Sequence, residues 1–167
     1  LSLEAIDFDP RVLVREATAV VALRAQEKGL AFTSVVSESV PAGLRGDPVR
    51  LRQVLVNLLG NAVKFTEHGE VCVTASASPA DEGQYTFHIA VRDTGIGIPA
   101  DRMDRLFKAF TLVDVSTTRI YGGTGLGLAI VRTLSAVMGG TAWVESAAGQ
   151  GSTFHFTFVA QGASEPA

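Results

Sequence analysis

The chain has 167 residues, of which 47% are hydrophobic and 19% are charged, and its net charge is −3. This composition is typical of one globular domain, and it excludes a disordered chain and a strongly basic nucleic-acid-binding domain. Cys72 is the only cysteine, which excludes an intrachain disulfide and favours a reducing compartment such as the cytoplasm. No apolar run reaches the roughly 18 residues of a membrane-spanning helix. We therefore expect no nucleic-acid or membrane contact by this segment, an expectation that leaves a membrane-anchored parent protein open.

Proline, glycine and aspartate mark the ends of the elements predicted for the first half. Pro10 suits the first turn of a helix, and Gly29 suits the position after its last residue. Asp47 is a typical N-cap, and Pro48 follows it at the first position of a second helix. The predicted elements are a strand at 5–9, a helix at 10–28, strands at 30–37 and 43–46, and a helix at 47–65.

The second half combines strand pairs with one further helix. Residues 99–123 show no sustained period, which favours a lid that nucleotide orders. The small and polar residues after 160 predict a domain at 1–160 and a linker or tail at 161–167. The predicted elements are strands at 70–78 and 84–92, a helix at 125–138, and strands at 141–146 and 152–159.

The predicted fold class is α/β, in the form of an α+β two-layer sandwich. Strands joined by short turns pair antiparallel, so the sheet is expected to be mixed but mainly antiparallel. Three main helices would cover one of its faces. The alternation of polar and apolar residues along the strands predicts a solvated opposite face.

The helix at 47–65 carries an unusual polar face. At about 100° per residue, its apolar residues lie opposite a polar arc that includes two asparagines one turn apart. Asparagine is a poor helix former, and Gly60 in the same arc costs about 1 kcal/mol relative to alanine. A helix that accepts these costs on one face is expected to place that face at a site. The arc consists of Arg50, Gln53, Asn57, Gly60, Asn61 and Lys64.

The residue types of this arc indicate phosphate chemistry. Asparagine oxygens are ligands that Mg²⁺ accepts beside water and phosphate, and a lysine can meet a phosphate as a point charge. No Asp or Glu lies on this face of the helix, so it offers no general base to activate water. This combination favours phosphoryl transfer to an outside acceptor over hydrolysis.

Two glycine-rich segments suit a nucleotide. Asp93 ends a predicted strand, where its carboxylate can accept a hydrogen bond from an exocyclic amine such as that of adenine. Gly95 and Gly97 remove side chains where the backbone approaches a flat ligand. Taken alone, this segment is more often a tight turn with a capping aspartate. Residues 122–128 open a helix whose backbone N–H groups favour anions, but they lack the Gly-Lys-Ser/Thr of a P-loop.

Four segments in this order resemble the N, G1, G2 and G3 boxes of the catalytic ATP-binding domain of sensor histidine kinases. These kinases belong to the GHKL superfamily, together with type II topoisomerases, heat-shock chaperones and mismatch-repair ATPases. Residues 106–121 resemble the F box and lid of the hybrid type. The resemblance implies the Bergerat-type fold, with ATP and Mg²⁺ as ligands. The four segments are residues 57–66, 93–99, 122–128 and 149–154.

The resemblance also implies a role for each matching residue. Asn61 would bind Mg²⁺, with Asn57 close to it or sharing it, and Lys64 and Arg119 would complete the catalytic set. Thr153 would lie behind the adenine pocket. Lys108, Ala109 and Leu112 stand where such lids often carry Glu, Pro and Gln, which leaves the contacts of the lid open. The residues implied to bind ATP are Asn61, Lys64, Asp93, Gly95, Gly97, Phe107, Phe110, Thr124, Gly125, Leu126, Gly127, Leu128 and Thr153.

The implied activity is that of a protein-histidine kinase in two-component signalling. The chain opens on Leu1, so we expect a fragment of a longer protein whose acceptor histidine lies on a separate dimerisation domain, in the same or a partner subunit. A receiver domain or response regulator would be the next partner. His68, His88 and His155 lack an acceptor motif, so the fragment alone is expected to be monomeric and not to autophosphorylate, whereas the full-length kinase would be dimeric.

Two other functions remain open at this point. One is a pseudokinase-like module that binds nucleotide and signals by conformation, which the altered lid residues favour and the intact nucleotide motifs disfavour. The other is an anti-sigma-type serine kinase of the same superfamily, against which the long lid with residues 116–121 argues.

Overall fold

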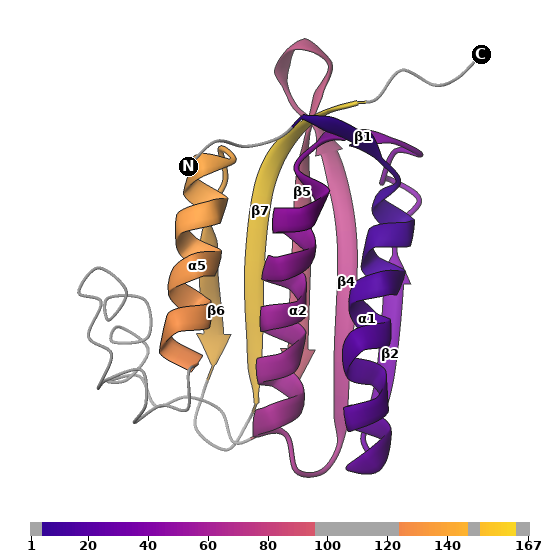
Figure 1. The fold of residues 1–167 in the computed structure, drawn as a ribbon, viewed down its shortest axis with the longest axis vertical. Coiled ribbons are helices and arrows are strands. Elements are labelled where there is room, and N and C mark those ends of the chain that lie inside the picture. Colours follow the sequence, from indigo (N-terminus) through magenta and orange to yellow (C-terminus); the bar gives the residue numbers. More distant parts are fainter. Residues whose placement is uncertain (1–4, 96–123, 147–150, 163–167) are drawn as a thin grey trace.

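The computed structural model describes residues 5–95, 124–146 and 151–162. Figure 1 shows two layers, with the helices α1, α2 and α5 lying on one face of a sheet, as the sequence predicted. The elements are β1 (Ile6–Phe8), α1 (Pro10–Glu27), β2 (Ala31–Val36), β3 (Leu44–Gly46), α2 (Pro48–Phe65), β4 (Glu70–Pro79), the 3₁₀ turn η1 (Asp81–Gly83), β5 (Gln84–Asp93), α5 (Thr124–Val137), β6 (Ala142–Ser146) and β7 (Ser152–Gly162).

The sheet is mixed and mainly antiparallel, which confirms the predicted class. Its strands follow the order β1-β3-β7-β5-β4-β2, and β6 pairs with β7 beside this path. Among the described strands, β2 and β4 form the one parallel pair, with Ala31 opposite Glu70. The connection between these two strands includes α2, which gives the crossover that a parallel pair needs.

Both long helices begin on aspartate caps, of which the sequence predicted Asp47. Asp9 accepts a hydrogen bond from the backbone N–H of Arg11 at 2.9 Å, and Pro10 occupies the first turn of α1. Asp47 accepts from the backbone N–H of Arg50 at 3.1 Å at the start of α2. Each cap satisfies one of the N–H groups that a helix leaves unpaired at its N-terminus.

The core lies between the helices and the inner face of the sheet. Alternate residues of the central strands point inward, among them Val73 of β4, Ile89 of β5 and Phe156 of β7. The leucines of α2 meet them and are fully buried, whereas Asn57 and Asn61 are half-buried and Lys64 is exposed. The projection of the sequence on a helix is therefore confirmed. The buried leucines of α2 are Leu51, Leu55, Leu58 and Leu59.

Strand β7 extends beyond its predicted end. It runs to Gly162, three residues beyond the predicted strand and two beyond the domain end predicted at 160. Gln161 pairs with Gln84 of β5 and with Arg45 of β3, and Gly162 pairs with Leu44. These residues belong to the sheet because β3 offers an edge to which the strand can bond.

The outer face of the sheet is less uniformly solvated than predicted. His88 of β5, His155 of β7 and Trp143 of β6 stack across three strands, with ring centroids 4.6 Å apart for Trp143 and His155 and 5.1 Å apart for the two histidines. His88 Nε2 and His155 Nδ1 lie 2.9 Å apart. Burial and the neighbouring His155 lower the pKa of His88. Both histidines thus have a structural role, in agreement with their lack of an acceptor motif.

Candidate functional site

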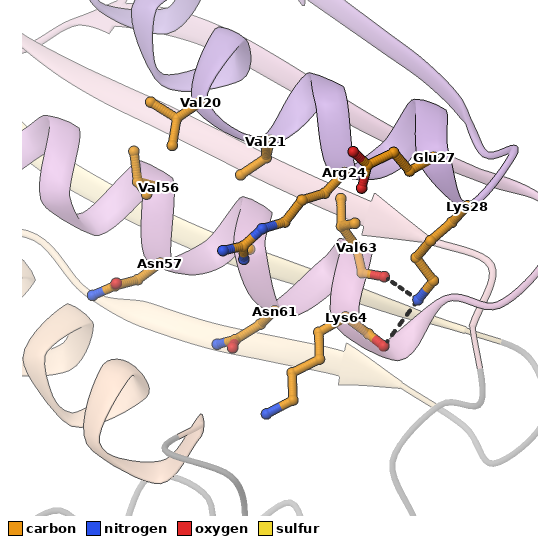
Figure 2. Close-up of a pocket in the computed structure, with 11 residues that line it drawn as sticks. Val20, Val21, Arg24, Glu27, Lys28, Val56, Asn57, Asn61, Val63 and Lys64 are labelled. Carbon is orange, nitrogen blue, oxygen red and sulfur yellow. Dashed lines mark hydrogen bonds between the residues drawn. The ribbon is translucent and has the colours of Figure 1, made fainter.

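The polar face of α2 lines a groove of about 780 Å³ between α1 and α2. Figure 2 shows the side chains of Asn57, Asn61 and Lys64 pointing to the same side of α2, with the lining residues of α1 across the groove. The structure therefore brings together the three residues of this helix for which the sequence predicted a site. The lining residues are Val20, Val21, Arg24, Glu27, Lys28, Val56, Asn57, Gly60, Asn61, Val63 and Lys64.

The two asparagines suit a cation that is shared with phosphate. They are one helical turn apart and both half-buried, so one side of α2 offers two neutral amide oxygens. Two such oxygens are too few to hold Mg²⁺, which prefers six oxygen ligands and keeps water or phosphate oxygens in its shell. The residues present therefore fit a metal ion that arrives with a phosphate ligand.

Gly60 lines the groove without placing a side chain in it. A Cβ atom built on Gly60 would meet nothing within 4 Å, so packing in the described structure does not require glycine. An alanine would stabilise the helix by about 1 kcal/mol. The missing side chain leaves room between Asn57 and Asn61, which supports a site on this face.

Asp93 is the last residue of β5 and is only 5% exposed. Its Oδ1 accepts a hydrogen bond from the backbone N–H of Gly95 at 2.9 Å, so it does cap its own turn. Burial raises the pKa of the Asp93 carboxyl, while backbone hydrogen bonds from Gly95 and Ser152 lower it. A buried carboxyl group whose pKa burial raises, at the end of a strand, supports an acceptor that is used on a ligand.

The raised pKa gives a prediction for stability without nucleotide. A carboxyl group whose pKa is higher in the folded state stabilises the fold most below the unfolded pKa of about 3.9. This contribution is lost as the pH rises through the folded pKa. We therefore expect the melting temperature of Asp93→Asn, relative to wild type, to increase as the pH is raised from about 4 to about 7. Scanning calorimetry of both proteins across this pH range measures the difference in melting temperature. A decrease of this difference with rising pH would contradict burial as the main influence on the pKa of Asp93.

Gly151 explains why β7 can begin beside Asp93. Its φ is +83°, and a Cβ atom there would collide with the backbone carbonyl of Asp93. Ser152 is the residue directly opposite Asp93 in the pairing of β5 with β7. Thr153, which the sequence analysis placed behind the adenine pocket, pairs with the exposed Arg92 and points to the outer face of the sheet. Neighbouring strand residues point to opposite faces, so Ser152 shares the buried side of the sheet with Asp93, and the implied place of Thr153 behind the adenine pocket stays a prediction.

Four separate segments of the chain meet at one end of the two layers. Figure 1 shows the end of α2, the end of β5, the start of β7 and the start of α5 at this end of the molecule. Helix α5 begins at Thr124, so the backbone of the predicted segment Thr124–Leu128 forms its first turns. The N-terminus of a helix favours anions. The end of the fold that holds Asp93 and Lys64 therefore also holds a helix N-terminus.

Several predicted residues lie outside the described part of the chain. They are Gly97, Phe107, Phe110 and Arg119. For Thr124, Gly125, Leu126, Gly127 and Leu128 the structure describes the backbone, so their implied contacts with ATP stay predictions.

Helix α1 contributes residues that the sequence analysis missed. Arg24 and Lys28 line the groove from the side opposite the asparagines, and Figure 2 shows Arg24 reaching toward α2. Glu27 brings a carboxylate to the same groove, although none lies on the polar face of α2. A basic residue in the last turn of a helix is common, so no signal in the sequence marked these residues.

The fold and the groove define a class: two-layer α/β domains with three helices on one face of a mixed sheet and a polar groove in the helical layer. A family model described as "Histidine kinase-, DNA gyrase B-, and HSP90-like ATPase" matches residues 46–162. The chain belongs to this family, and its resemblance to the catalytic domain of sensor histidine kinases is confirmed.

Curated relatives are sensor kinases much longer than this chain. The signal transduction histidine-protein kinase BarA of Escherichia coli (strain K12) is 41% identical over 156 residues, which cover 93% of this chain and 17% of BarA. The sensor histidine kinase AruS of Pseudomonas aeruginosa is 46% identical over 153 residues, which cover 92% of this chain and 15% of AruS. The chain thus spans less than a fifth of the length of these relatives.

Solved structures of histidine kinases share the fold. Full-length ShkA in complex with AMPPNP has a TM-score of 0.78 and 41% identity, covering 100% of this chain and 33% of that chain. The nucleotide-free catalytic domain of ThkA has a TM-score of 0.70 and 25% identity, covering 93% of this chain and 95% of that one. Within the described residues, no helix combines the length and apolar character that crossing a bilayer requires.

Proposed function

We propose that this chain is the catalytic domain of a histidine kinase. It binds Mg-ATP and transfers the γ-phosphoryl group to a histidine on a phosphoacceptor domain of its parent protein. The polar face of α2 carries the proposal, because it offers Asn57, Asn61 and Lys64 together to phosphate and metal. The structure of ShkA in complex with AMPPNP matches this chain over its full length, and this similarity supports ATP as the nucleotide.

Each residue of the proposed site has a role that follows from its position in the fold. Asp93 accepts a hydrogen bond from the adenine amine and fixes the base at the end of β5. Asn57 and Asn61 hold Mg²⁺, and Lys64 and the N-terminus of α5 stabilise negative charge on the phosphates. ATP supplies the phosphoryl group, and Mg²⁺, when bound by Asn57 and Asn61, would supply positive charge beside it. A bond forms from a histidine nitrogen to the γ-phosphorus, the bond to the bridging oxygen breaks, and ADP leaves.

The parent protein provides the partners. The acceptor histidine lies on a dimerisation domain in the same or a partner subunit, and a receiver domain or response regulator takes the phosphoryl group next. Hybrid kinases among the relatives, such as hybrid signal transduction histidine kinase C of Dictyostelium discoideum, support this arrangement. We place the domain in the cytoplasm because ATP, its phosphate donor, is an intracellular metabolite.

The direct test is phosphorylation of the parent's dimerisation domain by this chain. We expect labelled ATP and Mg²⁺ to give a phosphate on the acceptor domain that is labile in acid and stable in base, as phosphohistidine is. The chain alone should acquire no such label on His68, His88 or His155. ATP binding without transfer to the acceptor would favour the pseudokinase alternative, and acid-stable phosphate on serine would favour the anti-sigma type.

A further inference from the structure

Lys28, the residue that caps the C-terminus of α1, connects this helix to the end of α2. Lys28 Nζ donates to the carbonyl oxygen of Val63 at 2.8 Å and to that of Lys64 at 3.2 Å, as the dashed lines of Figure 2 show. Its side chain is 28% exposed. Lys28 and these carbonyls are more than 30 residues apart in the sequence, so packing of the two helices creates the contact.

The end of α2 needs such a donor. The last four carbonyl groups of a helix have no partner within it, and they carry the negative end of the helix dipole. At Thr66 the chain leaves α2 in an extended conformation, with φ −108° and ψ 114°. A charged ammonium group that donates to two of these carbonyls forms hydrogen bonds stronger than those between neutral groups.

The turn that Lys28 holds is the one that carries Lys64. The backbone carbonyl of Lys64 accepts a hydrogen bond from Lys28, while the Lys64 side chain points to the side of α2 that carries Asn61 (Figure 2). We propose that Lys28 is a positioning residue of the nucleotide site, which fixes the last turn of α2 and thereby the place of the Lys64 ammonium. This inference rests on the proposed function of the site.

Lys28 is committed to the protein rather than to a ligand. Two of its three donors are used on carbonyl groups, and the Glu67 carboxylate lies 3.6 Å from its nitrogen. Its ammonium therefore stabilises the frame of the site, and Lys64 carries the charge that meets phosphate. The two lysines should then act as a unit, so their substitutions should be non-additive.

The test compares Lys28→Met, Lys28→Arg and Lys64→Met in the full chain. Lys28→Met removes the charged hydrogen bonds to the last turn of α2, and part of the lost stabilisation is expected to appear as weaker nucleotide binding. We expect Lys28→Met to weaken ATP binding about 3- to 10-fold and to slow transfer to the acceptor domain, with Lys28→Arg restoring both to within about threefold. In the Lys64→Met background, Lys28→Met should add less than about twofold. Glu67→Gln is the matched control, since it removes only the 3.6 Å ion pair.

A second measurement needs no nucleotide. Amide hydrogen exchange in the last turn of α2 should be at least about tenfold faster in Lys28→Met than in wild type, because this turn loses its anchor. Unchanged exchange in the last turn of α2 of a folded Lys28→Met protein would overturn the positioning role. The role would also be overturned if Lys28→Met weakened ATP binding as much in the Lys64→Met background as in the wild type. Failure of the wild-type chain to bind ATP would instead contradict the proposed function. If Lys28→Met does not fold, Lys28→Gln, which replaces the charged ammonium by a neutral amide, takes its place in both measurements.

Discussion

Asp93→Asn is expected to weaken ATP binding about 5- to 150-fold with the fold intact. The carboxylate can only accept hydrogen bonds, whereas the asparagine amide presents a donor to the donor of adenine. A buried polar group left without a partner costs about 1–3 kcal/mol, and each 1.4 kcal/mol is a factor of ten in affinity. Because Asp93 is only 5% exposed, water cannot compensate for the lost bond.

Titration calorimetry with ATP and Mg²⁺ measures the effect on Asp93→Asn. Asp81→Asn is the matched control, since Asp81 is exposed and lies in η1, in the connection between β4 and β5 that Figure 1 shows at the opposite end of β5. The control should bind ATP like the wild type. Equal affinity of the Asp93 variant and the wild type would remove Asp93 from the proposed adenine site.

Asn61→Ala is expected to reduce Mg²⁺-dependent phosphoryl transfer by about 10²–10³-fold, the size of losing one well-placed group that stabilises a transition state. Removing the amide oxygen takes away one of the two protein ligands proposed for the metal. The fold should be retained, because Asn61 is only half-buried and alanine is the best helix former.

Transfer to the acceptor domain, measured with increasing Mg²⁺, tests the role of Asn61. A raised Mg²⁺ requirement in the variant would support metal binding directly. Gln26→Ala is the control, because it truncates an exposed amide on α1 outside the groove. Transfer by Asn61→Ala at the wild-type rate would contradict the metal site.

The order of the elements and the faces of α2 were predictable from local patterns. Pro10 and Pro48, each after an aspartate, set the starts of the two long helices to the residue. The 3.6-residue period of the leucines of α2 predicted which side is buried, and hence that Asn57 and Asn61 share the other. Such features depend on neighbours within a few positions, which the sequence displays directly.

Contacts between distant segments depended on the packing of the layers. The sequence indicated no role for Lys28, because its partners, the carbonyls of Val63 and Lys64, become available only when α1 lies beside α2. The place of Ser152 opposite Asp93 follows from the register of β7 on β5. A shift of one residue turns a side chain to the other face of the sheet. Motif residues near in sequence to their partners could thus be assigned from the chain alone, whereas those that face a distant strand or helix required the tertiary structure.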